Sequence, residues 1–357
     1  MRPMRTPQQT LFNGSIGLVI GLFLSRLISE QFLSGQPVFI LSLTAVFSAT
    51  FSLFFHRFPS QKTWPLSLLW LYVFYPTPRP DFGLAVGFTA VVAILLINLP
   101  TAHAPRRLAL LALIAPLLLY SLTLAPALLP ADNGEFQLVG ATLGLAHPPG
   151  FPLYTLLAHL STWLPLPLTA GQKINLLSAV LASLTLGLVA LTTQHLTQTN
   201  NAKHSVVATS VAVLALATST TFWAQAVMAN IRIPTAVFAT LAFYALFRFH
   251  TATRLTDTPS ADRWLALFAL TMSLGLTHHL SLAFMALVMG LFILWVDPRF
   301  LLAPSRWTRP CLAALLGLLP LLYLPLADPT LRDPAAFLAY ALGLGFQGDF
   351  FYFHTAA

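Results

Sequence analysis

The chain has 357 residues, of which 57% are hydrophobic and 8% are charged, and its formal net charge is +8. Soluble globular domains carry roughly a quarter charged residues, so this composition excludes an ordinary soluble protein and predicts a multi-spanning membrane protein. The basic residues are scattered over separate short loops, so the positive charge does not indicate a nucleic-acid partner.

Apolar segments long enough for a helix across a hydrocarbon layer of roughly 30 Å recur along the whole chain. Because lipid offers the backbone no hydrogen-bond partner, we expect every span to be a helix. The sequence therefore predicts an all-α integral membrane protein with about eleven transmembrane helices, at 11–29, 37–55, 64–76, 82–99, 107–128, 174–193, 205–222, 232–248, 264–280, 282–296 and 311–327. The first apolar segment lacks a small-residue cleavage site, and we expect it to be retained as a span.

The placement of Lys and Arg predicts the orientation, because these residues collect in short cytoplasmic loops. If the N-terminus is cytoplasmic, the inner side holds thirteen basic residues: Arg2, Arg5, Arg57, Lys62, Arg106, Arg107, Lys203, Arg248, Arg254, Arg263, Arg299, Arg306 and Arg309. The outer side then holds four: Arg79, Lys173, Arg232 and Arg332. This asymmetry predicts a cytoplasmic N-terminus and an outer location for the long loop 129–173.

The polar residues divide the chain into three parts. Residues 1–105 show no paired polar residues and are expected to be a four-span N-terminal extension. Residues 106–327 hold seven predicted spans, the outer loop 129–173 and every conspicuous polar cluster, and 328–357 form a short outer tail. Within the outer loop, helical spacing of apolar residues predicts two amphipathic helices on the membrane surface, over 135–145 and 154–164. The intervening Pro-Pro-Gly-Phe-Pro run predicts a turn.

The outer loop begins with two carboxylates, Asp132 and Glu135, in a chain with ten Asp and Glu residues in all. Ionisable residues near hydrocarbon are candidates for function, and a carboxylate here can act as a general base toward a hydroxyl. The same spacing also fits a capping box, in which Asp132 caps a helix and Glu135 reaches back to the cap. One residue can cap while the other reacts, so both interpretations stay open.

Other polar residues at the predicted outer rim are candidates for binding an anionic ligand. Arg232 is the strongest of them, because its guanidinium suits phosphate oxygens. Single histidines are more often structural, and His278 and His279 are no metal pair, since adjacent helical residues point about 100° apart. The expected substrate-binding residues are His147, Lys173, Gln225, Asn230, Arg232, His278 and His279, and no metal ligands are predicted.

Several sequence blocks carry a resemblance to a known family. They are Ala131-Asp132-Asn133-Gly134-Glu135-Phe136, Leu145-Ala146-His147-Pro148-Pro149-Gly150-Phe151-Pro152-Leu153-Tyr154, Asn175-Leu176-Leu177-Ser178-Ala179, Phe222-Trp223-Ala224-Gln225-Ala226, Gly275-Leu276-Thr277-His278-His279 and Gly317-Leu318-Leu319-Pro320-Leu321-Leu322-Tyr323-Leu324-Pro325-Leu326. Over about 107–345 the chain resembles a bacterial membrane family related to the vertebrate transmembrane protein O-mannosyltransferase, within the GT-C glycosyltransferase superfamily.

The resemblance implies a GT-C-like core in a bacterial inner membrane. It also implies transfer with inversion from a polyprenyl-phosphate-linked sugar to a hydroxyl-bearing acceptor on the outer face. Asp132 would be the catalytic base, with Glu135 as its partner or alternate. Whether a divalent cation or a membrane protein partner takes part is left open. The chain departs from the family in having Ala229-Asn230-Ile231-Arg232 where an acidic residue is usual, and no large outer domain is expected after Ala357.

Two other functions remain as alternatives. A non-catalytic membrane subunit or polyprenyl-lipid-binding protein would keep the same fold without transferring a sugar. A transporter is less favoured, because the ionisable residues lie at the predicted outer rim and none marks a site at the middle of the membrane between repeated halves.

Overall fold

The structure is a computed structural model that describes residues 7–32, 37–55, 60–97, 104–197 and 202–344. Every regular element in these ranges is a helix, which confirms the predicted all-α class. The chain divides into two compact units, Met1–Arg107 and Leu108–Ala357. Some predictions fall outside the described ranges. They concern Arg2, Arg5 and Arg57, predicted to be cytoplasmic, and residues 345–357 of the predicted tail.

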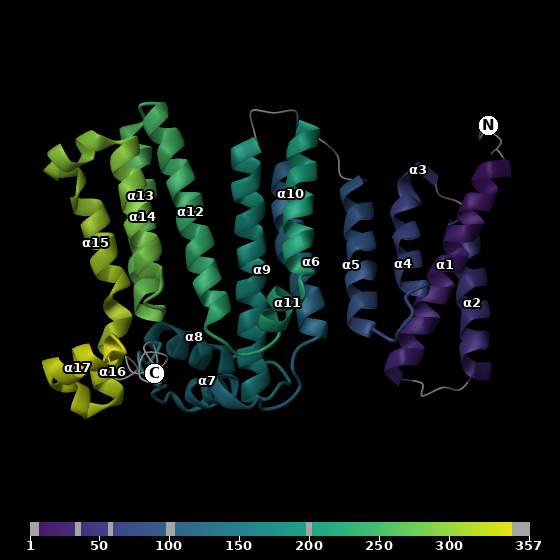
Figure 1. Cartoon of the computed structure of the whole chain (residues 1–357), viewed down its shortest axis with the longest axis horizontal. Coiled ribbons are helices and arrows are strands. Elements are labelled where there is room, and N and C mark those ends of the chain that lie inside the picture. Colours follow the sequence, from purple (N-terminus) through teal and green to yellow (C-terminus); the bar gives the residue numbers. More distant parts are fainter. Residues whose placement is uncertain (1–6, 33–36, 56–59, 98–103, 198–201, 345–357) are drawn as a thin grey trace, which may run out of the picture. The chain divides into compact units, whose positions relative to one another are not determined.

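The first unit is a small bundle of helices (Figure 1). Aliphatic and aromatic side chains form its core. The predicted span 64–76 is not one α-helix, because a 3-10 helix over Trp64–Leu69, with Pro65 near its start, precedes the short helix α4. The helices are α1 (Pro7–Phe32), α2 (Pro37–Phe55), α3 (Ser60–Thr63), α4 (Trp70–Val73) and α5 (Pro80–Ile97).

The first unit contains a polar cluster that the sequence analysis did not predict. Arg26 and Glu30, one turn apart on α1, form an ion pair with a distance of 2.6 Å between Nε and Oε1. The Tyr72 hydroxyl donates to the second oxygen of Glu30 at 2.5 Å, and the Arg26 guanidinium donates to the carbonyls of Tyr72 and Val73. The expectation that residues 1–105 hold no paired polar residues is therefore wrong. A spacing of four on an apolar helix was the signal that could have revealed the pair.

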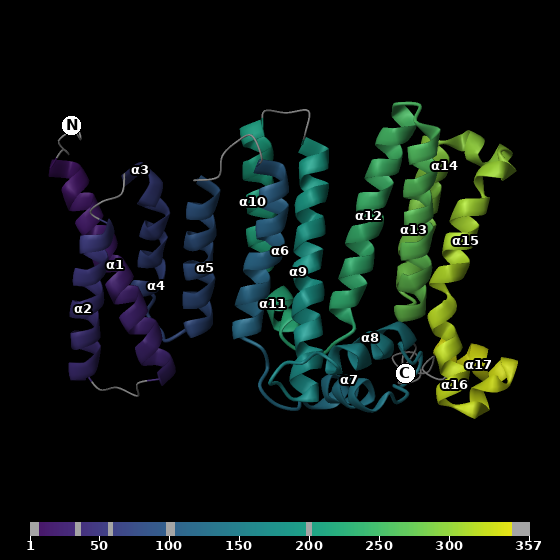
Figure 2. The ribbon, with the colours of Figure 1, turned by 180° about the vertical axis from the view of Figure 1, so that it is seen from behind.

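In the second unit, long helices run side by side and two short ones, α7 and α8, lie across one end of them (Figures 1 and 2). The turn between α12 and α13 lies at the opposite end (Figure 1). The α-helices are α6 (Ala104–Leu122), α7 (Ala131–Thr142), α8 (Pro152–Thr162), α9 (Ala170–Thr197), α10 (Ala202–Ala217), α11 (Thr220–Ala226), α12 (Arg232–Arg254), α13 (Thr258–His278), α14 (Leu282–Val296), α15 (Thr308–Gly317), α16 (Tyr323–Ala327) and α17 (Pro334–Ala341).

The two predicted outer-loop helices are present as α7 and α8. Helix α7 begins four residues earlier than predicted, at Ala131, so that it includes Asp132 in its first turn. Its inward side packs with α8 and α9 around Phe136, Tyr154 and Ile174, all of which are buried. This apolar cluster fixes the helices that carry the candidate site.

Four helices in the described ranges are long and apolar enough to cross a membrane: Pro80–Ile97, Ala170–Thr197, Arg232–Arg254 and Pro304–Ala327. A fifth candidate is the pair His204–Ala217 and Thr220–Ala226, which is bent by 67° where 205–222 was predicted to be a single span. Helix α6 ends at Leu122, short of the predicted 128. The membrane class is supported by these helices, while the number of eleven spans stays a prediction.

Candidate functional site

Asp132 lies in the first turn of α7 and does not cap it. The capping position belongs to Pro130, whose backbone is extended, and no side chain makes a cap hydrogen bond there. The capping-box interpretation is therefore wrong: Asp132 is a helical residue and Glu135 bonds elsewhere. Within the described ranges the exposed Asp132 carboxylate has no hydrogen-bond or ion-pair partner, and its charge is favoured by the nearby helix N-terminus.

Gly134 explains how the chain turns into α7. A Cβ atom at this position would lie 2.0 Å from the Leu129 carbonyl oxygen, so only glycine allows the preceding loop to pass so close. The buried Gln137 side chain completes the turn by accepting the Leu129 N–H at 3.0 Å. The Asp-Asn-Gly-Glu run thus contains a glycine that the path of the backbone requires, next to the two candidate carboxylates.

Glu135 binds His147 through both of its carboxylate oxygens. Oε1 accepts the backbone N–H of His147 at 2.7 Å, and Oε2 lies 2.6 Å from the ring Nδ1. About a third of each side chain is exposed, 33% for Glu135 and 34% for His147. This two-point contact fixes the imidazole on the carboxylate and places a proton on Nδ1.

Phe151 connects the predicted histidines. Its buried ring lies 5.4 Å from the His147 ring, 6.2 Å from His278 and 6.4 Å from His279, measured between centroids. Phe136 packs edge-on against the same ring at 5.4 Å. Phe151 has a left-handed backbone with φ of 43°, which directs the chain from the turn into α8. The sequence blocks around 147 and 278 therefore meet at one aromatic residue.

The two histidines at the end of α13 differ in their surroundings. His278 is buried, and its Nε2 lies 2.8 Å from the Ile231 carbonyl oxygen, so it ties α13 to the start of α12. His279 is half-buried beyond the helix end, and its Nδ1 lies 2.7 Å from the Ser281 hydroxyl.

Hydrogen bonds connect Gln225 at the end of α11, Asn230 in the following turn and Arg232 at the start of α12. The buried Asn230 side chain donates to the carbonyls of Gln225 and Met228 at 2.6 Å, and its oxygen accepts the N–H groups of Arg232 and Ile233 at 2.9 and 3.0 Å. All of its polar capacity is used by the backbone, which gives Asn230 a structural role. Arg232 is exposed, and within the described ranges its side chain makes one hydrogen bond, to Gln225 Oε1 at 3.3 Å.

Lys173 lies at the start of α9 and joins it to α8. Its Nζ donates to the Thr162 carbonyl at 3.0 Å, at the end of α8. This bond satisfies one of the carbonyls that a helix end leaves without a partner. Lys173 thus supports the position of α8 in this structure, and its predicted role in ligand binding stays a prediction.

A network of buried amides holds α7 against α9, and the sequence analysis missed it. The Asn175 oxygen accepts the Gln137 amide at 3.0 Å and the Ala229 N–H at 2.9 Å, while its nitrogen donates to the Ala125 carbonyl at 3.0 Å. Asn133 donates to the Ala229 carbonyl at 2.6 Å. Asn133 and Asn175 belong to the resemblance blocks, and polar amides among apolar residues were the only available signal.

Two tyrosines near the C-terminus also bind the loop that carries His147. The Tyr323 hydroxyl donates to the carbonyls of Leu143 and Gly144 at 2.9 and 2.6 Å, and the Tyr340 hydroxyl of α17 donates to the Ala146 carbonyl. Burial, followed by the negative charge of Glu135, raises the pKa of Tyr340 to about 12. The segment 323–341 is therefore bonded to the loop that carries His147.

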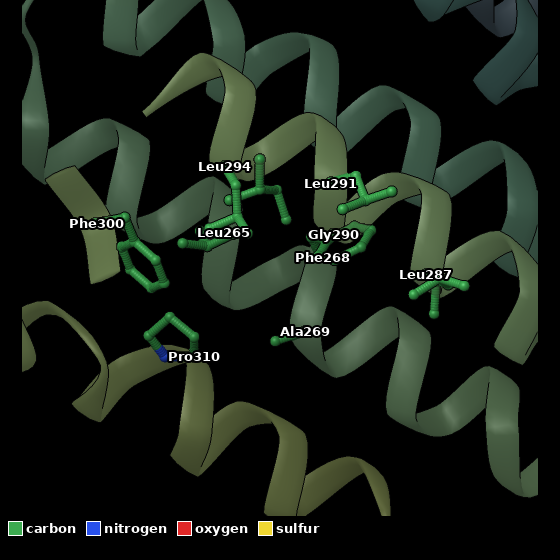
Figure 3. A pocket seen from close by; sticks show the side chains of 11 residues that line it. Leu265, Phe268, Ala269, Leu287, Gly290, Leu291, Leu294, Phe300 and Pro310 are labelled. Atoms are coloured by element: carbon green, nitrogen blue, oxygen red, sulfur yellow. The ribbon is translucent and has the colours of Figure 1, made fainter. Parts of the chain in front are cut away.

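Two cavities in this unit have different linings. A cavity of about 660 Å³ lies between α7 and the start of α9, and Glu135 and Gln137 are among its lining residues. A hollow of about 460 Å³ on α13, α14 and α15 is lined only by apolar side chains and a glycine, and Figure 3 shows Leu291 and Phe300 among them. Of these two cavities, the first is bordered by a carboxylate, that of Glu135, and the second by apolar residues. Among the described residues, no three His, Cys, Asp or Glu side chains are grouped to hold a metal ion.

Comparisons with known proteins connect this site to a family. Residues 132–300 match the family model described as "Protein O-mannosyl-transferase TMEM260 N-terminal domain". The chain is 28% identical over 213 residues to "Protein O-mannosyl-transferase TMEM260" of Mus musculus, which covers 58% of this chain and 29% of the mouse protein. It is 34% identical over 70 residues to "Protein O-mannosyl-transferase tmem260" of Dictyostelium discoideum, covering 19% of this chain and 8% of that protein.

The chain thus spans less than a third of the length of these curated relatives. No solved structure matches it. The matched range begins at Asp132 and includes every residue predicted for the site. The similarity supports a mannosyltransferase-like family, in agreement with the resemblance seen in the sequence blocks.

Proposed function

We propose that this chain is a membrane glycosyltransferase that moves a sugar, mannose by analogy with its relatives, from a polyprenyl phosphate to a hydroxyl-bearing acceptor. The observation that carries the proposal is the first turn of α7. There the unpaired carboxylate of Asp132 lies one helical turn from the Glu135–His147 contact, in the range similar to the O-mannosyl-transferases. We place this site at the outer face of a bacterial inner membrane, within a GT-C-type core.

The reaction we propose is a single in-line displacement. The acceptor hydroxyl oxygen forms a bond to the anomeric carbon as its proton passes to the Asp132 carboxylate. The bond between the anomeric carbon and the phosphate oxygen breaks, and the polyprenyl phosphate leaves with that electron pair. Because phosphate is a good leaving group, positioning and charge stabilisation would supply most of the rate.

The geometry supports a distinct role for each of the other residues. Arg232 is exposed and retains most of its donors, which suits a cation that holds the leaving phosphate. Glu135 is occupied by His147, so we assign it to positioning that imidazole rather than to proton transfer. The assay described below also determines whether the acceptor hydroxyl belongs to a protein, a lipid or a glycan.

The test compares Asp132→Asn with the wild type. The full chain is reconstituted in liposomes containing radiolabelled polyprenyl-phosphate mannose, and transfer to Ser- and Thr-rich peptides and to glycan and lipid acceptors is measured. We expect the variant to bind donor normally and to lose transfer by roughly 10²-fold or more, the scale of general-base catalysis.

Asp333→Asn is the matched control. Asp333 is another exposed carboxylate, it accepts the Ala336 N–H at the start of α17, and Asn caps a helix as well as Asp. This variant should transfer like the wild type. An Asp132→Asn variant that keeps full transfer would remove Asp132 from the mechanism.

The second candidate is a non-catalytic subunit that binds polyprenyl lipid. It is favoured by the turn before α12, where Ala229-Asn230-Ile231-Arg232 offers no carboxylate and Asn230 is used internally. Under this alternative the wild type binds donor but transfers to none of the acceptors, and Asp132→Asn is indistinguishable from it.

A further inference from the structure

A second polar hollow lies at the end of the bundle opposite to the candidate site. It has a volume of about 360 Å³ and is lined by Arg248 of α12 and by Ser260, Arg263, Trp264 and Leu267 of α13. It lies near the turn that joins these two helices, at the end farthest from α7 and α8 in Figure 1. Nothing in the proposed transfer reaction uses these residues.

Arg248 is held in place by aromatic side chains rather than by acids. Its guanidinium carbon lies 4.5 Å from the Trp264 ring centroid and 5.8 Å from that of Tyr244, and it donates to the Tyr244 hydroxyl at 3.0 Å. Stacking on aromatic rings fixes the plane of a guanidinium while leaving most of its N–H groups available to a ligand.

Neither arginine of the hollow forms an ion pair with a carboxylate in the described part of the chain, whereas Arg26, Arg79 and Arg306 do. Arg306 at the same end forms ion pairs with both Asp262 and Asp297, at 2.8 and 2.7 Å. Asp257, just before α13, accepts the Ser260 N–H at 3.1 Å and forms no ion pair with either arginine of the hollow among the described residues. The hollow therefore keeps a positive charge.

The depth of the hollow corresponds to a membrane interface. Arg248 follows Arg232 by sixteen residues on the continuous helix α12, a rise of roughly 24 Å at about 1.5 Å per residue. The hydrocarbon layer is roughly 30 Å thick, so two arginines so separated lie near its opposite faces. Trp264 fits this position, because tryptophan is enriched at the interface between membrane and water.

We propose that this hollow binds the phosphate of an anionic membrane lipid, in the leaflet opposite to the candidate active site. The two guanidinium groups and the Ser260 hydroxyl would hold the phosphate oxygens, and Trp264 and Leu267 would contact the glycerol and the first acyl carbons. Free phosphate shares the head-group chemistry, but the apolar wall and the depth favour a lipid.

The experiment measures lipid retention by the full chain. The wild type is purified from detergent containing phosphatidylglycerol and phosphatidylcholine, and bound lipid is counted by native mass spectrometry. We expect selective retention of phosphatidylglycerol, reduced about fivefold in Arg248→Gln, which is the scale of one basic residue at a membrane surface. Arg263→Gln is the second variant, because Arg263 is exposed and its side chain forms no hydrogen bond or ion pair with the residues that the structure describes.

The matched control is Arg254→Gln, which removes an exposed arginine from the last turn of α12 outside the hollow. It should retain phosphatidylglycerol like the wild type. Equal retention in all variants, or equal loss in Arg254→Gln and Arg263→Gln, would overturn the proposal. Displacement of the lipid by millimolar inorganic phosphate would assign the hollow to a soluble anion instead.

Discussion

The two glutamates of this chain are both held by a nearby side chain. Glu30 binds Arg26 and Tyr72, and Glu135 binds His147. Asp132, three residues before Glu135, has no such partner among the described residues. The sequence presented the two outer carboxylates as equivalent candidates, and the contact with His147 separates them into one that positions and one that is free to react.

Glu135→Gln tests the positioning role at the level of one residue. The amide oxygen of Gln can accept only one of the two His147 donors, and its NH₂ group faces the other. Because about a third of the pair is exposed, we expect a loss of about 1 kcal/mol in the stability of this contact. The measurement is hydrogen exchange of the His147 backbone amide, which should become faster, together with reduced sugar transfer.

Asp132→Asn is the control for this effect. It leaves both His147 bonds intact, so the amide of His147 should exchange at the wild-type rate even where transfer is lost. If Glu135→Gln leaves the exchange of His147 unchanged, the two-point contact does not hold this loop.

Sequence reasoning identified the ionisable residues of the site better than its amides and tyrosines. Asp132, Glu135 and His147 are conspicuous because charge is scarce and apolar spacing is regular around them. Asn175 and Tyr340 carry no comparable signal, since their partners lie far away in the sequence, at Gln137 and Ala146. Such contacts become visible only when the helices are packed.

At the scale of elements, hydropathy predicted the positions of helices but not their continuity. The segments 205–222 and 311–327 both have a high average hydropathy, yet the first is bent by 67° after Ala217 and the second contains a 3-10 turn over Leu319–Leu322. Pro320 explains the latter, because it lacks the N–H needed by a continuous helix. The bend at Thr218 and Ser219 coincides with the hydroxyl-bearing run Thr218-Ser219-Thr220-Thr221, which the average hydropathy of the segment concealed. The segment predicted as one continuous helix is therefore a bent pair of helices, and whether the pair forms one span stays a prediction.

The segment α16–α17 binds the His147 loop, and Tyr340→Phe tests this connection. Loss of the phenol removes the hydrogen bond to the Ala146 carbonyl, and we expect a loss of about 0.5–1.5 kcal/mol near neutral pH. The measurement is the difference in Tm between the wild type and the variant, in detergent.

The pH dependence of that difference follows from the raised pKa. A tyrosine in an unfolded chain has a pKa of about 10, whereas that of Tyr340 in the fold is about 12. The folded protein thus binds this proton more tightly, so the stabilisation is fully present below about pH 10 and is lost as the pH rises toward 12. The advantage of the wild type over Tyr340→Phe should shrink across this interval. A constant difference would contradict a donating phenol.

At the scale of the whole molecule, the arrangement of α12 links charge to topology. Within the second unit, Arg232 begins this helix at the end that carries the candidate site, and Arg248 and Arg254 follow at the other end. Arg232, predicted to be outside, therefore lies at one end of this continuous helix, and Arg248 and Arg254, predicted to be cytoplasmic, lie toward the other end. Which end faces the cytoplasm is a prediction from the thirteen-to-four distribution of Lys and Arg in the sequence.

Single-cysteine labelling tests this orientation in intact cells. Cys311, the one cysteine and an exposed one, is first replaced by serine. Thr169→Cys is then introduced into the exposed turn before α9, and Ser305→Cys, also exposed, serves as the matched position at the other end. An impermeant thiol reagent should label Thr169→Cys directly and Ser305→Cys only after the membrane is permeabilised. The reverse pattern would invert the orientation. The proposed transfer site would then face the cytoplasm, and the phosphate hollow would lie in the outer leaflet.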